Sequence, residues 1–364
     1  SAFRFLAGSC RYPSQFLDAG LADEVYAGMF GHVERDDGVD MVFLLGDQIY
    51  ADATAGLIDS DDIRERYVER YRAAFGSSHF ARLCGSVPVH FAVDDHEIDD
   101  QWSGAPCLRD STDQAMRIAT SYQWRFPRTG MYDYKGLAYA LPHPDEVACP
   151  VFVMDARFER AYRDGRNPGA ARMIGPAQQA LLDAWLLQAS AFDGPKFIVS
   201  SVVLAPFDRR AIGANGHVDL SDGSSWTEDG WGGYPATLAW LIRRIVELRV
   251  KQVVFVGGDQ HLSSVSELQL DVGGEEPVTA WHVVASGLYT PLPLASLQRE
   301  EVATTATVRV EHGVSFRYAT RLLCHDYRHF VRVDARRSNG HWQLDVCTCD
   351  AAGQVIHAHP PIPL

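Results

Sequence analysis

Several side chains that could perform chemistry follow directly after short apolar segments of this 364-residue chain. The segment Met41–Leu45 has the length and composition of a buried β-strand, and Gly46 and Asp47 follow it. Tyr50 lies in the same predicted loop. An aspartate at the carboxyl end of a strand lies where open α/β sheets place their ligands. A single such aspartate could equally cap the next helix, so the interpretation depends on the other strands.

Other predicted strands end in the same way. The side chains are Cys10 after residues 3–7, Asp95 after residues 87–93, and Asp259 with His261 after residues 252–256. Thiolate, carboxylate and imidazole are all metal ligands, and their repetition at four strand ends favours a metal centre over unrelated caps and turns. With Tyr50 the set has six members, which would leave no open position in one octahedral shell. We therefore expect two cations about 4 Å apart, which would hold the attacking and leaving oxygens of a phosphate ester.

Composition restricts the classes of partner. The chain has 33 basic and 47 acidic residues, a formal net charge of -14, and 46% hydrophobic residues. This charge argues against a general nucleic-acid or anionic-membrane surface, but a bound cation can still attract a small phosphoester. The seven cysteines are scattered without a paired CxxC motif, so at least one thiol is free or metal-bound. The oligomeric state stays open.

No apolar run approaches the roughly 20 residues that a membrane-spanning helix needs. No signal peptide is visible, which fits a cytoplasmic protein, or a periplasmic or secreted one if a leader was removed. Strands alternate with helices predicted over residues 16–34, 61–75, 112–125, 176–190 and 236–249, and residues 262–357 are mainly β. Residues 208–235 form a long predicted loop. With no repeat and no clear linker, we expect residues 1–364 to form a single α/β domain with mixed sheets.

The ordered motifs resemble those of the metallophosphoesterase superfamily, and of its alkaline phosphatase D (PhoD-like) branch in particular. They are Gly8-Ser9-Cys10, Gly46-Asp47-Gln48-Ile49-Tyr50, Asp94-Asp95-His96-Glu97, Asp155-Ala156-Arg157 and Gly258-Asp259-Gln260-His261. The second motif is also similar to that of the purple acid phosphatases, in which the tyrosine binds ferric iron. The resemblance covers residues 3 to about 290. It implies an αββα four-layer sandwich. The sequence departs from some PhoD-like proteins in that we expect no separate N-terminal β domain.

The resemblance also implies roles and cofactors. Asp47 matches a carboxylate that bridges two metals, and Cys10 and Tyr50 match iron ligands. Asp95, Asp259 and His261 match further metal ligands, without showing which ion each of them binds. The family implies ferric iron together with calcium, although manganese, zinc or magnesium are alternative occupants. Neighbouring side chains on an extended chain point in opposite directions. We therefore expect Asp94, next to Asp95, to support the metal ligands rather than to bind a metal itself.

Two side chains are candidate catalytic residues. His96 matches a histidine that stabilises the transition state or protonates the leaving group. Arg157 either binds the phosphate, as a planar guanidinium can, or pairs with Asp155 or another ligand carboxylate. The isolated histidine of the superfamily has no clear match. Ser201 or Asn215 are candidates for that position, and water or an acid such as Asp99 or Asp100 could also complete the shell.

The predicted activity is phosphoester hydrolysis, in which a metal-activated water or hydroxide attacks phosphorus. A phospholipase D-like phosphodiesterase is the alternative within the same class. A non-catalytic metal-binding module with the same fold is a second alternative, which the presence of His96 disfavours. A metallohydrolase acting on amides or lactones is a third, but its His-x-His-x-Asp-His block is missing from the sequence.

Overall fold

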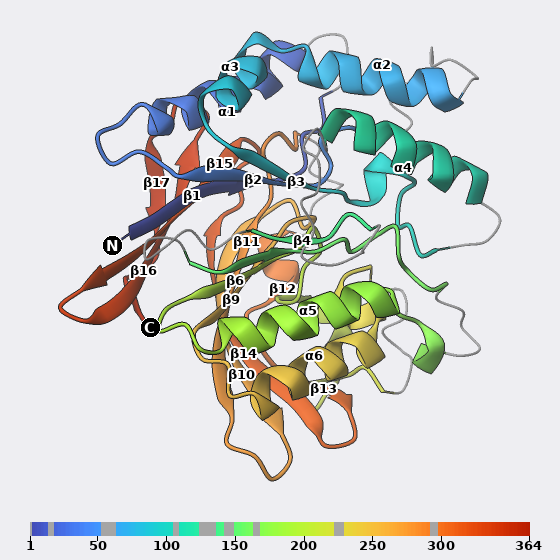
Figure 1. Ribbon diagram of the computed structural model, residues 1–364, viewed down its shortest axis with the longest axis vertical. Coiled ribbons are helices and arrows are strands. Elements are labelled where there is room, and N and C mark those ends of the chain that lie inside the picture. The colour runs from blue at the N-terminus through green and yellow to red at the C-terminus, as the bar shows by residue number, and fades with distance from the viewer. Residues whose placement is uncertain are drawn as a thin grey trace.

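The computed structural model describes residues 2–13, 18–51, 63–104, 109–123, 136–141, 149–162, 168–221, 229–291 and 298–364. Within these residues two mixed β-sheets lie face to face, and helices cover their outer faces (Figure 1). This is the αββα arrangement that the motifs predicted. Among the described helices, none is both long and apolar enough to cross a membrane.

The first sheet contains both chain ends of the described structure. Its strand order is β17 (Val355–Ala358), β16 (His341–Asp350), β15 (His329–Ser338), β1 (Ala2–Gly8), β2 (Met41–Leu45) and β3 (Val89–Ala92), with β18 (Ile362–Pro363) paired to β16. Strands β1, β2 and β3 run parallel to one another, whereas β15 is antiparallel to β1. The carboxyl ends of the three parallel strands therefore meet at one edge of the sheet.

The second sheet carries the remaining predicted strand ends. Its order is β4 (Tyr139–Ala140), β5 (Val151–Val153), β6 (Lys196–Val199), β9 (Val253–Gly257), β11 (Val278–Ala285), β10 (Ser263–Val272), β14 (Val314–Cys324), β13 (Thr305–Glu311) and β8 (His217–Asp219). Neighbouring strands in the run β5, β6, β9 and β11 are parallel. A separate two-stranded sheet pairs β7 (Phe207–Asp208) with β12 (Val302–Ala303).

Apolar side chains from both sheets fill the space between them. Phe5 of β1 contacts Phe43 of β2 and Phe197 of β6 edge to face, with ring centroids 5.1 Å apart in each pair. Val254 and Val283 from the second sheet belong to the same buried cluster. Such edge-to-face pairs add to the hydrophobic stabilisation of a core. This core fixes the two sheets against each other and so brings their strand ends together.

Helices pack on the two outer faces. Helix α1 (Ala19–Val33) and α3 (Ser78–Ser86) bury Met29 and Leu83 against β1 and β2. Helix α5 (Pro176–Ala189) and α6 (Pro235–Glu247) cover the second sheet. Helix α3, whose N-cap is Ser77, was not predicted, because its nine residues are fewer than the window over which helical periodicity is recognised.

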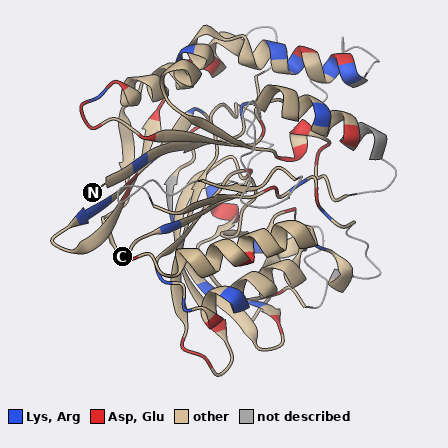
Figure 2. Cartoon of the chain, viewed as in Figure 1, with Lys and Arg blue, Asp and Glu red and all other residues tan. Residues whose placement is uncertain are grey.

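Helix α2 (Ile63–Phe75) and α4 (Arg109–Gln123) pack against each other and against the loops that follow β2 and β3. Basic and acidic residues alternate along α2 (Figure 2). Arg64, Glu65 and Glu69 are exposed, whereas Tyr67 and Tyr71 are buried. The charged run is therefore the solvated face expected from its i,i+4 spacing.

The long loop predicted over residues 208–235 contains more structure than the sequence indicated. Strand β8 joins the edge of the second sheet by pairing with β13, and a short 3₁₀ turn, Trp231–Gly233, leads into α6. Trp231 is 1% exposed, whereas Trp226 lies outside the described residues. Residues 262–357 are mainly β, as predicted. The assignment of the chain to one domain stays a prediction.

Candidate active site

The predicted ligands meet where the parallel strands of both sheets end. Cys10 follows β1, Asp47 follows β2 and Asp95 follows β3, while Asp259 and His261 follow β9 of the other sheet. Backbone hydrogen bonds tie these loops together. The amide of Cys10 donates to the carbonyl of Gly46, and the amide of Gly258 donates to the carbonyl of Ser201. The core between the sheets therefore places side chains that are some 250 residues apart in one cluster.

Four of these side chains stand on backbone that non-glycine residues seldom adopt. The φ angles of Cys10, Asp47, Asp259 and His261 are 60°, 53°, 72° and 57°. A positive φ costs a non-glycine residue on the order of 1–3 kcal/mol and persists where the surrounding structure imposes it. Such residues cluster at functional sites. The repetition at four predicted ligands indicates that these loops are shaped to aim their side chains at a common point.

Two glycines allow the loops to approach each other. Gly46 has φ +97°, and a Cβ there would collide with the Cβ of Asp94. A Cβ on Gly258 would lie 2.6 Å from Ser9 Oγ and 2.8 Å from the carbonyl oxygen of Ser201. The glycine of each Gly-Asp pair therefore permits close contact between neighbouring strand ends.

The first part of the cluster combines a thiol, a carboxylate, a phenol and an imidazole. Ligand atoms of Cys10, Asp47 and His261 all lie within 4.8 Å of one another. The Cys10 thiol lies 3.3 Å from Asp47 Oδ2, and the Tyr50 hydroxyl lies 3.3 Å from the same oxygen. Tyr50 is also 3.4 Å from His261 Nε2. Ser286 donates to the Cys10 sulfur and accepts from the His261 amide, which holds both residues in place.

The second part of the cluster is made of carboxylates. Oxygens of Asp47, Asp94, Asp95 and Asp259 lie within 4.8 Å of one another, and those of Asp47 and Asp95 also group with His96. Asp94 was expected to point away from its neighbour, and this was wrong, whereas its role as a support for the ligands stays a prediction. The chain turns at once into the 3₁₀ helix Asp95–Glu97, so both carboxylates reach the cluster. Asp47 belongs to all three groups, which fits a carboxylate between two cations.

His96 lies at the outer side of the cluster. Its ring packs on Tyr50 with centroids 4.2 Å apart, and Tyr50 stacks on Tyr12 at 4.1 Å. The His96 side chain is 18% exposed, and its Nε2 lies 3.9 Å from Asp100 Oδ1. An imidazole that is both near the carboxylates and open to solvent can exchange protons during a reaction.

Arg157 lies behind the carboxylates rather than at the surface. Its side chain is fully buried, with Nε 2.5 Å from Asp94 Oδ1 and Nη1 2.6 Å from Asp229 Oδ2. Nη2 lies 3.6 Å from Asp95 Oδ1. The Asp155 carboxylate accepts from the backbone amide of Arg157. Of the two interpretations, this geometry favours pairing with ligand carboxylates, and a catalytic role for Arg157 stays a prediction.

Asp229 lies in the long predicted loop of residues 208–235 and was not singled out in the sequence. Burial raises the pKa of this carboxyl, but the charges of Arg157 and Arg160 overcome burial and hold the pKa at about 2. Arg160 Nη1 lies 2.8 Å from Asp229 Oδ1. Asp229 is therefore the anion that compensates the buried guanidinium groups. A loop aspartate carries no local signal for this role.

Glu97 is a second residue whose role the sequence did not predict. It is fully buried, and its carboxylate accepts hydrogen bonds from the backbone amides of Asp47, Gln48 and Asp94 at 2.7–2.9 Å. Burial raises the pKa of Glu97 to about 7, although these hydrogen bonds oppose the rise. Glu97 thereby fixes the strand ends that present Asp47 and Asp94. The signal was its place as the last residue of the Asp-Asp-His-Glu motif.

The donor set fits bound cations. Asp47 Oδ1, Asp94 Oδ2 and Asp95 Oδ1 are buried without a hydrogen-bond partner in the described part of the chain. Buried polar atoms are usually paired. Burial, followed by the neighbouring acidic groups, raises the pKa of Cys10 to about 12 and that of Asp47 and Asp259 well above their usual values. A positive charge among these groups would reverse that trend, so the residues match the metal site that their types predicted.

Other predicted candidates divide between the site and the surface. Ser201 is fully buried, and its hydroxyl has no hydrogen-bond partner among the described residues. Its carbonyl accepts from the Gly258 amide, so Ser201 stands beside Asp259. Asn215 instead lies in an exposed turn before β8 and bonds to the His217 amide, away from the cluster. Asp99 and Asp100 belong to none of the groups with metal-binding geometry in the described structure.

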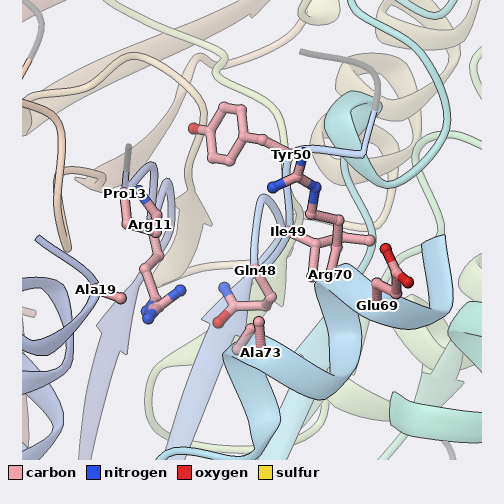
Figure 3. Close-up of a pocket in the computed structure, with 10 residues that line it drawn as sticks. Arg11, Pro13, Ala19, Gln48, Ile49, Tyr50, Glu69, Arg70 and Ala73 are labelled. Atoms are coloured by element: carbon pink, nitrogen blue, oxygen red, sulfur yellow. The ribbon is translucent and has the colours of Figure 1, made fainter. Parts of the chain in front are cut away.

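A pocket opens next to the cluster on the side of Tyr50. Arg11, Gln48, Tyr50 and Arg70 are among the residues that line it, and Arg70 extends from α2 toward Tyr50 (Figure 3). The Arg11 guanidinium pairs with Asp23. With Glu69, which also lines the pocket, the wall combines an aromatic ring with charged groups of both signs.

Comparison with known proteins identifies the family. A model of the PhoD-like phosphatase family matches residues 5–124 and 147–344. The chain belongs to the PhoD-like phosphatase family. This membership indicates a phosphoester hydrolase, and the matched ranges contain every predicted site residue of the PhoD-like chain.

A solved structure described as "Structure of PhoD" is similar in fold to this PhoD-like chain. It superposes with a TM-score of 0.61 at 15% identity, covering 99% of this chain and 72% of the other. The likeness supports the α/β architecture. No curated protein matches the chain.

Proposed function

We propose that this PhoD-like protein hydrolyses phosphoesters at a pair of cations that share Asp47. The observation that carries the proposal is the presence of Asp47 in all three groups of metal-binding geometry in the candidate active site. Cys10 and His261 form one group with this carboxylate, and Asp95 and Asp259 belong to another, so we take the two groups as the two sides of the centre. The two sides differ in ligand chemistry, which supports two different ions.

The side with Cys10, Tyr50 and His261 suits ferric iron. A thiolate, a phenolate and a carboxylate would place three negative charges around one ion, a shell that favours a trivalent metal. The side with Asp94, Asp95 and Asp259 offers only carboxylate oxygens, which calcium and magnesium prefer. We therefore assign His261 to the iron and Asp259 to calcium. When bound, the two ions would neutralise the phosphate oxygens and lower the pKa of a water molecule.

Other residues of the protein would hold the metal ligands in position and transfer a proton. Glu97 and Ser286 hold the loops of Asp47, Cys10 and His261 through backbone and side-chain hydrogen bonds. Arg157 fixes Asp94 by a buried ion pair. His96, partly exposed at the edge of the cluster, would donate a proton to the leaving oxygen. The pocket beside Tyr50 would receive the organic part of the substrate.

The test is hydrolysis of a chromogenic phosphate monoester by protein stripped with a chelator and then reloaded. We expect activity to disappear on stripping and to return with ferric iron plus calcium, with manganese, zinc and magnesium tested separately. Asp47→Asn should fail to recover under any loading, because it removes the shared charge. Full turnover by protein shown to be metal-free would refute the proposal.

A phosphodiesterase of phospholipase D type remains the alternative within this class. A panel with a monoester, a diester and an amide at equal concentration separates the possibilities. Preference for the diester would support the phosphodiesterase. Bound metals without turnover on any phosphoester would instead identify a non-catalytic module.

A further inference from the structure

A second group of metal-binding side chains lies outside the candidate active site. Cys324 ends β14, Asp326 follows in the next turn, and His357 belongs to β17. A ligand atom of each lies within 4.8 Å of the other two. None of the three belongs to a group that contains Asp47 in the described structure. No sequence motif indicated this group, because His357 is more than 30 residues from Cys324.

The group joins elements of different sheets. Strand β14 is part of the nine-stranded sheet, whereas β17 is at the edge of the seven-stranded sheet, and the two strands pack together. The pairing of β16 with β17 shifts register here, since Thr348 pairs with His357 and Cys349 pairs with Val355. Ile356 is thus an extra residue in β17. Bulges of this kind re-aim neighbouring side chains and are found next to functional positions.

The distances within the group suit a tetrahedral ion. Cys324 Sγ lies 3.6 Å from Asp326 Oδ2. Zinc–sulfur and zinc–oxygen bonds of about 2.3 and 2.0 Å at a tetrahedral angle would separate the two ligand atoms by roughly 3.5 Å. The backbone amide of Asp326 also donates to Cys324 Sγ at 3.3 Å. Hydrogen bonds of this kind orient a metal ligand from outside its coordination shell.

The same turn contains another imidazole whose hydrogen bonding is incomplete. Both ring nitrogens of His325 are buried and lack a hydrogen-bond partner in the described structure. Buried polar atoms without partners are uncommon and call for an explanation such as a water or an ion. The turn thus holds a buried imidazole with unsatisfied nitrogens beside the group of Cys324, Asp326 and His357, of which His325 is not a member.

We propose that Cys324, Asp326 and His357 bind a zinc ion that links strand β14 of one sheet to edge strand β17 of the other. Thiolate and imidazole favour zinc over calcium or magnesium, which prefer oxygen ligands. With three protein ligands, the fourth tetrahedral position is open to water. Zinc at this position stabilises the folded protein, since a ligand that binds only the native state shifts unfolding by mass action. The proposal is independent of the proposed catalytic function.

The experiment compares zinc binding by the stripped full chain and its variants under reducing conditions. His357 is exposed, so His357→Ala should fold like the wild type, as circular dichroism will verify. After equilibrium dialysis at low micromolar zinc, we expect this variant to retain one zinc ion fewer than the wild type. His341→Ala, at an exposed histidine of β16, is the matched control and should retain the wild-type amount.

Cys324→Ser provides a second readout with cobalt as the probe. Cobalt bound to thiolate absorbs in the near ultraviolet. In Cys10→Ser only the cobalt bound by Cys324 should contribute to this absorption. We expect Cys324→Ser to lose that contribution. Cys84→Ser, at an exposed cysteine of α3, is the control and should keep it. His357→Ala should hydrolyse phosphoesters at the wild-type rate. Equal zinc content in wild type and folded His357→Ala would overturn the proposal, whether or not Cys324→Ser folds.

Discussion

The carboxylate of Glu97 accepts a hydrogen bond from the backbone amide of Asp47 at 2.9 Å, although neither residue is exposed. The same carboxylate also binds the amides of Gln48 and Asp94. Two neighbouring strand ends are thereby held by one buried side chain. The positions of Asp47 and Asp94, which both take part in the candidate metal centre, depend on a residue outside the ligand groups of the described structure.

Glu97→Gln should weaken the metal centre while preserving the fold. The amide group of glutamine cannot accept from all three backbone amides, so the loops of Asp47 and Asp94 should loosen. Residues that orient metal ligands typically contribute ~10–100-fold to metal affinity or activity. We expect losses of this size in calcium titration and in turnover. Glu34→Gln, at an exposed glutamate paired with Arg82, is the matched control and should change neither.

His96→Ala should retain its metals and lose most of its turnover, because a positioned proton-transfer group contributes ~10²–10⁴-fold. His96→Phe separates this role from packing on Tyr50, since phenylalanine keeps the ring contact without a titratable nitrogen. Both variants should show the same deficit in steady-state kinetics at unchanged metal content. Recovery of turnover in His96→Phe would assign His96 to packing, and loss of metal would make it a ligand.

Iron-loaded protein should be coloured, since thiolate and phenolate transfer electron density to ferric iron when they absorb visible light. Tyr50→Phe should shift or weaken the band, and Cys10→Ala should alter it differently. Tyr12→Phe is the control, because Tyr12 stacks on Tyr50 at 4.1 Å and is not among the proposed ligands. A colourless and fully active protein containing only zinc or calcium would exclude iron and leave the phosphoesterase proposal intact.

Arg157→Gln should reduce the free energy of unfolding by about 3–5 kcal/mol, because it leaves Asp94 buried without its cation and removes one of the two guanidinium groups that pair with Asp229. Arg309→Gln is the comparison, since Arg309 pairs with Asp219 at 3.2 Å while 66% exposed, and such pairs contribute about 0–1 kcal/mol. Urea denaturation measures both. Wild-type stability with reduced turnover in Arg157→Gln would instead make Arg157 a substrate-binding residue.

His282 should make the folded state sensitive to mild acid. Burial lowers its pKa to about 4, against about 6.5 for an unfolded histidine. Below pH 6.5 the unfolded chain takes up a proton that the folded chain does not, so stability falls until about pH 4. By pH 5 this loss is about 2 kcal/mol. In urea denaturation at pH 7.5 and 5, His282→Gln should lose that much less stability than the wild type, whereas exposed His312→Gln should behave as the wild type.

The sequence by itself determined the strands, the ligand types and their order. A short apolar run followed by glycine and a polar residue is a local pattern, and it suffices to assign Asp47, Asp95 and Asp259 to strand ends. Buried parallel strands place their carboxyl ends at one edge, which explains why the predicted residues meet. The order of the motifs then indicated the family. Local pattern failed for α3, which is short, and for β8, which depends on pairing with β13.

Only the tertiary structure decided how the ligands divide and what supports them. His261 groups with Cys10, whereas Asp259 groups with the aspartates, although the two residues are separated by one position. Arg157 pairs with Asp229, which is 72 residues away. These relationships arise from the packing of one sheet against the other and from burial, which makes an unpaired charge costly and so selects its partners. No periodicity or spacing along the chain encodes them, because they are set by distances between segments that are remote in sequence.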